Sequence, residues 1–300
     1  MRLQRDDAPA EIWLKLESFQ PIGSFKLRGA ANAILSAPRA ELAGGVVTTS
    51  TGNMAQGVAW MARELGIPAT IVVPDNASQA KLAAVERLGG KVVRRSWEEW
   101  WTAVVEDRKA ALGEVAGVEG YFVHPVRDPP VIAGNGTIGL ELVEQLDAID
   151  AVFISWGGGG LTTGIASALH ALSPTTRIYV CEPDTGAPVT AAIANGGVPV
   201  PVDFTPSFID GAGSGSLLPV MWEHAGPLVT DAFAIPLSDA AATVRLLLER
   251  ARIVAEGAAA LTVAAALSGR VEAERIVCIV SGGNIDSSRL AEILAGRVPD

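Results

Sequence analysis

Three polar, glycine-rich loops have the residue types of a ligand site, and each follows an apolar stretch of the chain. They are Ser50-Thr51-Gly52-Asn53, Gly157-Gly158-Gly159-Gly160 and Ser281-Gly282-Gly283-Asn284. Loops that follow the strands of α/β sheets are where such folds bind ligands. A glycine run at a helix start leaves backbone N–H groups open to an anion. Residues 157–160, directly before Leu161, are therefore a candidate phosphate cradle, with a plain tight turn as the alternative.

Two nucleotide-binding motifs also compete for the loop at residues 157–160. The dinucleotide pattern G-x-G-x-x-G fails because Thr162 and Thr163 stand where its last glycine is needed, although Glu182 follows at the end of the next apolar stretch. An acid in that place is typical of ribose binding. The P-loop pattern is absent, because no Gly-Lys-Ser/Thr follows the glycines.

Lys26 is the candidate reactive amine. It stands in Gly23-Ser24-Phe25-Lys26-Leu27-Arg28-Gly29-Ala30, where Phe25, Leu27 and Ala30 begin a helical apolar face. Lys26 would then lie in the first turn of a helix, where the macrodipole disfavours a positive charge. A lysine kept neutral by such surroundings is suited to imine formation, whereas the ordinary interpretation is a solvated surface lysine.

The elements that must position these loops alternate between strand-like and helix-like along most of the chain. The apolar patterns predict strands over residues 45–49, 69–73, 91–94, 121–123, 151–155, 177–181 and 275–280, and helices over 53–65, 78–88, 96–112, 131–146, 161–172 and 238–251. Residues 183–227 are rich in Pro and Gly and are expected to be irregular. Such alternation predicts an α/β fold with parallel sheets covered by helices on both faces.

Composition narrows the classes of partner. The 300 residues are 49% hydrophobic and 19% charged, with a formal net charge of −10. An acidic surface repels phosphate backbones and anionic lipid, so we expect neither nucleic acid nor membrane as a partner. Cys181 and Cys278 lie in apolar stretches and are expected to be reduced thiols, and the start of the chain lacks the apolar stretch of a secretory signal. These features predict a cytoplasmic protein.

Five motifs in order make the chain similar to a known family. It resembles the fold-type II pyridoxal-phosphate-dependent enzymes, in particular the threonine/serine dehydratase and serine racemase branch. Besides the Lys26 segment and the three loops, the matching pieces include Ile132-Ala133-Gly134-Asn135-Gly136-Thr137. The resemblance spans residues 15–286. It implies a tryptophan synthase beta-like fold with two doubly wound α/β domains and pyridoxal 5′-phosphate as the cofactor.

The resemblance also implies roles for individual residues. Lys26 would bind the cofactor as an imine and later move the substrate's α-proton, with Phe25 packed beside the ring. Residues 50–53 would clamp the substrate carboxylate, and Asn53 would also contact the cofactor's 3′-oxygen. The cofactor phosphate would be held by Gly157, Gly158, Gly159, Gly160 and Leu161. Ser281 would meet the pyridine nitrogen, which a weakly acidic hydroxyl leaves largely unprotonated. Glu256 would lie near the ring, or simply be a carboxylate at a helix start.

Some positions depart from the family pattern. Met54 replaces the usual histidine and suggests a more apolar pocket, whereas Thr51 stands where the racemases have a serine acid/base. Glu182 matches a metal ligand of the racemase-like branch and Gly186 could add a carbonyl, but Pro188 replaces the expected aspartate. We therefore expect no metal, with Glu182 and Gly186 as the only candidates. The family also has a longer segment before its lysine motif, so the start is expected to be truncated or lost.

Two further segments resemble structural parts of the family. His124, followed by Pro125, falls at its His-Pro turn, for which a structural role is expected rather than a catalytic one. Residues 208–211 resemble a turn near the active-site mouth, and residues 212–218 a mobile loop over the cofactor.

By resemblance, the expected reaction is β-elimination from a 3-hydroxy amino acid, by default L-threonine or L-serine, to a 2-oxo acid and ammonia. A serine/threonine racemase using Lys26 and Thr51 is the main alternative. A β-replacement enzyme and a non-catalytic cofactor-binding protein are further ones. The expected domains are 1–45 with 123–300, binding the cofactor, and 46–122, clamping the substrate. The family implies a homodimer.

Overall fold

The computed structural model describes residues 1–3, 8, 10–77, 79–100 and 118–300. It divides into two compact units. The larger unit comprises Met1–Phe19 and Gly136–Asp300, and the smaller unit comprises Gln20–Asn135. The domain boundaries expected from the sequence, at 45/46 and 122/123, differ from this division. Helix α1 (Lys26–Ser36) belongs to the smaller unit because it packs against α2 (Asn53–Leu65) in a shared core.

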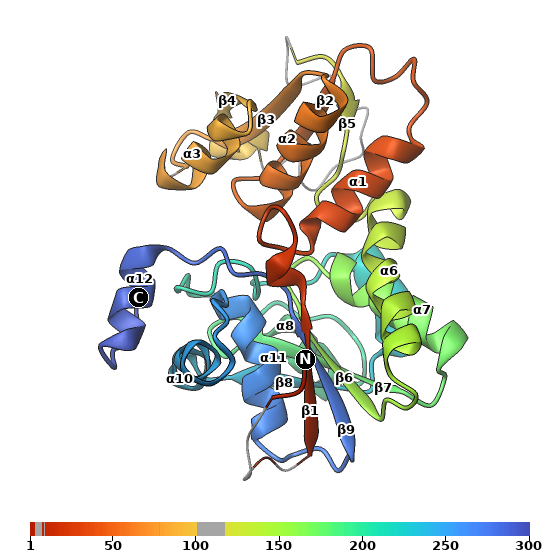
Figure 1. Ribbon diagram of the computed structural model, residues 1–300, viewed down its shortest axis with the longest axis vertical. Coiled ribbons are helices and arrows are strands. Elements are labelled where there is room, and N and C mark those ends of the chain that lie inside the picture. Colours follow the sequence, from red (N-terminus) through yellow and green to blue (C-terminus); the bar gives the residue numbers. More distant parts are fainter. Residues whose placement is uncertain (4–7, 9, 78, 101–117) are drawn as a thin grey trace. The chain divides into compact units, whose positions relative to one another are not determined.

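The larger unit contains a five-stranded parallel sheet in the order β1-β9-β6-β7-β8 (Figure 1). Its strands are β1 (Glu11–Leu16), β6 (Ala151–Ser155), β7 (Arg177–Pro183), β8 (Asp231–Ile235) and β9 (Arg275–Val280). Strands β6 and β9 are apolar except at Ser155 and Arg275, as expected where helices cover both faces of the sheet. Both strands were predicted from their apolar runs, whereas β1 and β8 were not.

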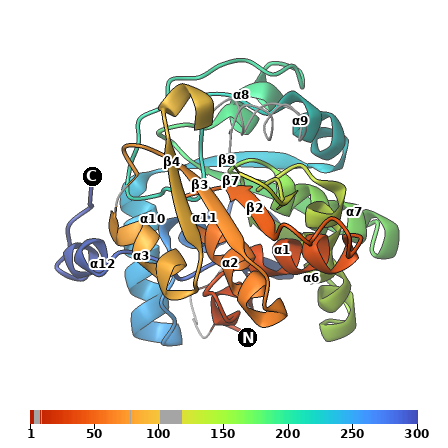
Figure 2. The ribbon, with the colours of Figure 1, turned by 90° about the horizontal axis from the view of Figure 1, so that it is seen from above.

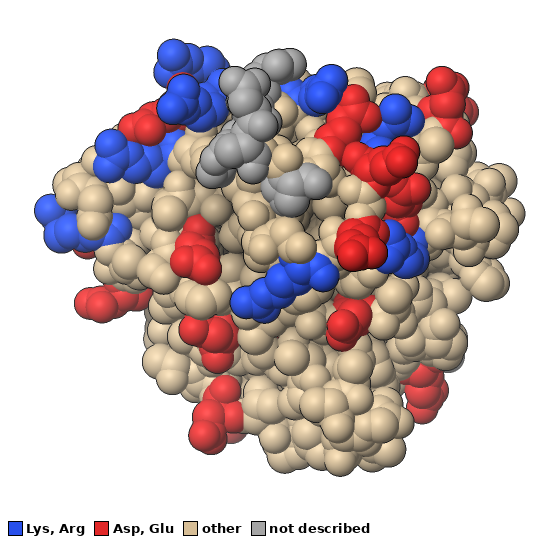
Figure 3. Space-filling view, turned by 90° about the horizontal axis from the view of Figure 1, so that it is seen from below, with Lys and Arg blue, Asp and Glu red and all other residues tan. Residues whose placement is uncertain are grey.

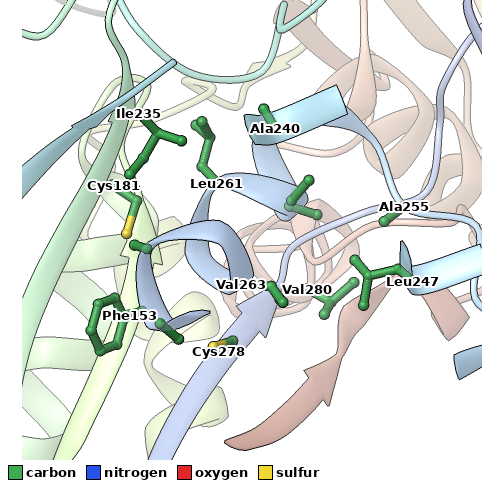
Figure 4. Packing of buried hydrophobic residues seen from close by; sticks show 14 of the residues in the cluster. Phe153, Cys181, Ile235, Ala240, Leu247, Ala255, Leu261, Val263, Cys278 and Val280 are labelled. Carbon is green, nitrogen blue, oxygen red and sulfur yellow. The ribbon is translucent and has the colours of Figure 1, made fainter. Parts of the chain in front are cut away.

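Helices pack on both faces of this sheet. Phe153, Cys181 and Cys278 lie in one core with α10 (Leu237–Leu246), α11 (Gly257–Leu267) and α12 (Ser287–Leu294), part of which Figure 4 shows. Val180, the neighbour of Cys181, belongs to a second core with α8 (Pro188–Ala194) and α9 (Pro219–Ala225), because successive strand residues face opposite sides. This arrangement confirms the predicted doubly wound α/β fold for the larger unit.

Two longer helices, α6 (Pro129–Gln145) and α7 (Gly160–Leu172), also contribute residues to the larger unit. Helix α7 follows β6, and α6 runs across the boundary between the two units. Short segments complete the unit: η1 (Glu17–Phe19), η2 (Gly226–Leu228) and the π-helical η3 (Leu247–Ala251). The expectation of irregular chain over residues 183–227 was wrong in part. Helices α8 and α9 lie within it, each beginning at a proline, which is well suited to a first helical position.

The smaller unit contains a four-stranded parallel sheet in the order β4-β3-β2-β5. Figure 2 shows β4, β3 and β2 side by side. The strands are β2 (Val46–Thr49), β3 (Ala69–Pro74), β4 (Lys91–Arg95) and β5 (Tyr121–Phe122), and helix α3 (Gln79–Arg87) lies between β3 and β4 along the chain. Parallel strands end at the same edge of a sheet. The chain after β2 and the chain after β5 therefore emerge together.

The helix expected over residues 96–112 lies mostly outside the described residues. Its predicted start is present, because Ser96 and Glu99 form a reciprocal capping box. The Ser96 N–H donates to Glu99 Oε2 over 3.0 Å, and the Glu99 N–H donates to Ser96 Oγ over 3.3 Å.

The charge distribution on the surface and the character of the helices relate to the expectation that neither nucleic acid nor membrane is a partner. Acidic and basic residues are interspersed among a larger uncharged area on the face shown in Figure 3. Within the described part of the chain, no helix has the length and apolarity needed to cross a bilayer.

Candidate active site

The tetraglycine loop forms the turn between β6 and α7 in the larger unit. Gly159 has a left-handed φ of +91°, and a Cβ atom built there would lie 2.7 Å from the ring of Trp156. Only glycine fits such a position. Because α7 begins at the next residue, the loop leads directly into the positive N-terminal end of a 13-residue helix. This geometry suits a phosphate.

A second glycine segment lies against this turn. A Cβ atom on Gly157 would be 2.8 Å from the carbonyl oxygen of Gly211, and the N–H of Gly213 donates to the carbonyl of Trp156 over 2.9 Å. Gly211, the last residue of the turn expected near the active-site mouth, and Gly213, in the loop expected over the cofactor, therefore contact the tetraglycine segment directly. Gly213 ties the start of the expected cofactor loop to the end of β6.

Ser281 lies at the end of β9, the sheet neighbour of β6. Its side chain is buried, and its Oγ has no hydrogen-bond partner among the described residues. Glu256 is close by, because its N–H donates to the carbonyl of Gly282 over 3.0 Å, and a Cβ on Gly282 would be 2.6 Å from Glu256 Oε1. The larger unit thus brings Ser281 and Glu256 together, as the sequence predicts for the surroundings of a ring.

Lys26 is the first residue of α1 in the smaller unit. Its Nζ donates to the backbone carbonyl of Pro125 over 2.7 Å and lies 5.2 Å from the ring centroid of Phe25. Phe25 itself is buried. The amine is therefore held by a carbonyl 99 residues further along the chain.

The loop after β2 lies at the same edge of the smaller unit. Helix α2 begins at Asn53, and Ser50 Oγ accepts a hydrogen bond from the Gly52 N–H over 3.3 Å. A Cβ on Gly57 would be 3.2 Å from the Lys26 carbonyl oxygen, so α2 approaches α1 closely here. Asn53 is one turn before Gly57, on the same face of α2. The lysine and the expected carboxylate clamp, residues 50–53 with Thr51, thus belong to neighbouring helix starts.

Met54, expected to make the substrate pocket more apolar, lies at the start of α2. Its side chain is 1% exposed and packs in the core of the smaller unit. It packs against the core beside the start of α2. This burial gives no support to the expectation that Met54 makes the substrate pocket more apolar.

Glu182, the candidate metal ligand, is fully buried at the end of β7. Its carboxylate accepts hydrogen bonds from the Val189 N–H, the Thr190 N–H and Thr190 Oγ1, at 3.1, 3.0 and 3.1 Å. The carbonyl of Gly186 accepts the Ser214 N–H over 3.2 Å. Burial raises the pKa of Glu182 to about 7, and the three hydrogen bonds partly offset this rise. Both groups are thus engaged within the protein. No cluster of three His, Cys, Asp or Glu side chains suited to a metal occurs in the described parts of the chain.

The predicted site residues therefore form two groups. Lys26, Phe25 and residues 50–54 belong to the smaller unit, whereas residues 157–161, Glu256 and Ser281 belong to the larger unit. Sequence reasoning missed the Pro125 carbonyl, because a backbone atom leaves no sign in the residue types. It also missed Asp128, whose carboxylate accepts the His124 N–H over 2.9 Å.

Comparisons with known proteins show which proteins this chain is similar to. A family model described as "Pyridoxal-phosphate dependent enzyme" matches residues 2–282. The L-threonine ammonia-lyase of Thermotoga maritima is 36% identical over 285 residues, covering 95% of this chain and 70% of that protein. The L-threo-3-hydroxyaspartate ammonia-lyase of Saccharomyces cerevisiae is 34% identical over 299 residues, 99% of this chain and 90% of that protein. The structure of maize serine racemase superposes with a TM-score of 0.85 at 31% identity, covering 96% of this chain and 87% of that one.

Proposed function

Because the chain belongs to the pyridoxal-phosphate dependent enzymes, we propose that it is an ammonia-lyase acting on a 3-hydroxy amino acid, by default L-threonine or L-serine. The products are a 2-oxo acid and ammonia. Family membership confirms the predicted cofactor and the fold-type II architecture. The activity itself is supported by relatives that are named ammonia-lyases of hydroxy amino acids.

The residues present fit the cofactor. Ser281 Oγ is a buried hydroxyl with no partner in the described structure, which is what a ring nitrogen would pair with. Gly157 and Gly159 leave no room for side chains at the start of α7, so a phosphate can approach the backbone. The single observation that carries the proposal is this unpaired Ser281 hydroxyl. A neutral hydroxyl partner limits the electron withdrawal by the ring, which suits loss of a β-substituent.

Each group of residues then has a defined task. When bound, pyridoxal phosphate supplies an electron sink next to the substrate's α-carbon. The backbone of residues 157–161 would hold the phosphate, and Ser281, beside Glu256, would pair with the ring nitrogen. Phe25 would pack by the ring, and Asn53 would contact it from the start of α2.

The smaller unit handles the substrate. Ser50, Thr51 and Gly52 precede the N-terminus of α2, where N–H groups and the helix dipole favour a carboxylate. Lys26 Nζ would take the proton from the α-carbon as general base, and the bond between the β-carbon and its oxygen would then break. The hydroxyl would leave with the bonding electron pair and take up one proton, so that water departs, and hydrolysis of the released enamine would give the 2-oxo acid and ammonia. In this proposal the larger unit binds the cofactor phosphate and the smaller unit clamps the substrate.

An absorbance spectrum of the purified protein tests the proposal. We expect an imine band that changes when L-threonine is added, with release of ammonia and a 2-oxo acid. Lys26→Ala should abolish both the band and the activity. Lys91→Ala removes an exposed lysine of the same unit and should leave both unchanged. Production of 2-oxo acid by the Lys26→Ala variant would refute the assignment.

A racemase is the second candidate, because Thr51 places a hydroxyl at the same edge as Lys26 and serine racemase is a structural neighbour. A hydroxyl on the opposite side of the α-carbon from the lysine can return the proton with inverted configuration. Exchange of the substrate α-proton with deuterium, without ammonia release, would identify this reaction and exclude the ammonia-lyase.

We also propose that the protein works as a homodimer in the cytoplasm. The family resemblance supports the dimer, and the acidic composition supports the location. Light scattering coupled to size-exclusion chromatography measures the assembly directly. A monomer at micromolar concentration with full activity would contradict the dimer.

A further inference from the structure

A short turn follows β5 in the smaller unit and is closed by the side chain of its first residue. His124 is 1% exposed, and its Nδ1 accepts hydrogen bonds from the Val126 N–H over 3.1 Å and the Arg127 N–H over 3.0 Å. A ring nitrogen that accepts two N–H groups carries no proton, so the proton of the neutral imidazole is on Nε2. The ring acts as an aspartate or asparagine oxygen does in an Asx turn.

One peptide group links this ring to the reactive lysine. The N–H of Val126 and the carbonyl of Pro125 belong to the same planar group, and all described peptide bonds are trans. In a trans peptide the N–H and the C=O point in opposite directions. When the Val126 N–H donates to His124 Nδ1, the Pro125 carbonyl must therefore point away from the ring, where it accepts Lys26 Nζ over 2.7 Å.

We propose that His124 is a positioning residue for Lys26, which acts by aiming the Pro125 carbonyl at the lysine amine. The carbonyl provides a resting place for the amine whenever it is not bonded to the cofactor. This inference rests on the proposed role of Lys26 and extends it to a residue that does not touch the substrate.

The surroundings of the turn hold the ring in one orientation. Phe122 packs edge-on against it, with ring centroids 6.2 Å apart and planes at 77°. The His124 N–H donates to Asp128 Oδ2 over 2.9 Å, and Thr48 Oγ1 in β2 donates to the carbonyl of Val123 over 2.8 Å. The turn is therefore attached to the sheet on one side and braced by a carboxylate on the other, so a rotation of the peptide group would break several contacts at once.

A carbonyl is a suitable partner for an amine that must leave and return. A carboxylate would form an ion pair and retain the charged form more strongly. A neutral acceptor orients the amine, and a typical hydrogen bond of this kind contributes little net free energy, so release is easy. Polarisation through the shared peptide group strengthens the carbonyl as an acceptor when its N–H is also bonded.

The test compares His124→Phe with His124→Asn in cofactor-free protein. Phenylalanine keeps an aromatic ring but has no acceptor, whereas the asparagine oxygen can accept the same two N–H groups. The rate of imine formation with pyridoxal phosphate is measured by stopped-flow absorbance. We expect this rate to be about tenfold lower in His124→Phe, because the amine loses the orientation that about one hydrogen bond provides. His124→Asn should react within about twofold of the wild-type rate on the same scale.

Deoxypyridoxine phosphate separates positioning from folding, because it has the phosphate but no aldehyde. Its affinity should be the same in all three proteins. If His124→Phe also loses this affinity, Asp128→Ala and Asp128→Asn take its place, since only the asparagine retains an acceptor for the His124 N–H. The alanine variant should then form the imine more slowly than the asparagine variant.

The outcomes are distinct. Equal imine formation in wild type and His124→Phe, or in the Asp128 pair, would overturn the positioning role and leave the proposed function intact. Slow imine formation in His124→Asn as well would show that the acceptor is irrelevant and also overturn it. A wild-type protein that forms no imine at all would instead refute the proposed function.

Discussion

Gly159 and Ser281 show two opposite uses of a side chain at the carboxyl edge of the larger unit's sheet. At Gly159 the turn requires a residue without a side chain, because φ is +91° and the Trp156 ring occupies the space that a Cβ atom would take. At Ser281 a hydroxyl is present and buried without a partner among the described residues. An unsatisfied buried polar group costs about 1–3 kcal/mol, so a ligand that pairs with it recovers this free energy on binding. Both residues favour a bound cofactor.

The first prediction concerns Gly159→Ala. The added methyl group would lie 2.7 Å from the Trp156 ring in an unfavourable backbone region, so the turn must change shape. We expect the affinity for deoxypyridoxine phosphate, measured by equilibrium dialysis, to fall at least about tenfold, because anchoring by backbone N–H groups depends on their exact aim.

Gly196→Ala is the matched control for this change. Gly196 also has a positive φ, +69°, and lies in the larger unit, but no atom is within 4 Å of the place that its methyl group would take. The control should lose about 1 kcal/mol of unfolding free energy from backbone strain and retain its affinity. Equal losses of affinity in the two variants would show that the Gly159 turn is no phosphate cradle.

At the scale of elements, Glu182 anchors helix α8 to strand β7. Its carboxylate accepts two N–H groups and one hydroxyl at the start of the helix, so a buried acid at a strand end serves as the cap of the next helix. Burial raises the pKa of this carboxyl to about 7 from an ordinary value of 4.5. The protonation state of the Glu182 carboxyl therefore changes near neutral pH.

The second prediction is a pH dependence of stability that Glu182→Gln reduces. Between pH 4.5 and 7 the folded protein binds a proton at Glu182 more readily than the unfolded chain does. Stability from this group is present below pH 4.5 and is lost as the pH rises through 7, by up to about 3 kcal/mol. Glutamine does not titrate, so the variant should gain stability relative to wild type between pH 5 and pH 7.

Urea denaturation at pH 5, 6 and 7 measures the difference in unfolding free energy between the two proteins. A difference that stays constant across this range would mean that Glu182 does not titrate between these values. Asp184→Asn, two residues further along the chain, serves as a control for removing an acid near the same strand end.

At the scale of the molecule, the chemistry is divided between two units. Lys26 and residues 50–53 belong to the smaller unit, and residues 157–161 and Ser281 belong to the larger one. In the proposed function, the cofactor phosphate would be bound by residues of the larger unit and its aldehyde carbon by Lys26, so the bound cofactor would contribute to the stability of both units. We therefore expect the cofactor to act as a structural link as well as a reagent.

The third prediction concerns cofactor removal. A ligand at one hundred times its dissociation constant stabilises the protein that binds it by about 2.7 kcal/mol. Removal of pyridoxal phosphate should therefore lower the melting temperature measured by calorimetry. In Lys26→Ala, pyridoxal phosphate should stabilise no more than deoxypyridoxine phosphate does, because only the phosphate contacts remain. A full stabilising effect in this variant would argue against the lysine bond.

Several elements could be recognised from local patterns. Helix α2 matches its predicted range because its apolar residues recur at helical spacing and Gly66 ends it in a left-handed conformation. In contrast, α11 was not predicted. It is buried on nearly all sides, as Figure 4 shows in part, so its apolar residues have no helical period to detect.

By itself, the sequence determined the family, the cofactor and the α/β class, and it predicted the loops to which we assign the chemistry, because these depend on residue types at short spacing. Only the tertiary structure decided the partners of Lys26 and Glu182. The amine of Lys26 meets a carbonyl 99 residues away, and Glu182 meets the start of a short helix. Such pairings depend on strand order and on the direction of single peptide groups, to which hydropathy and residue spacing are not sensitive.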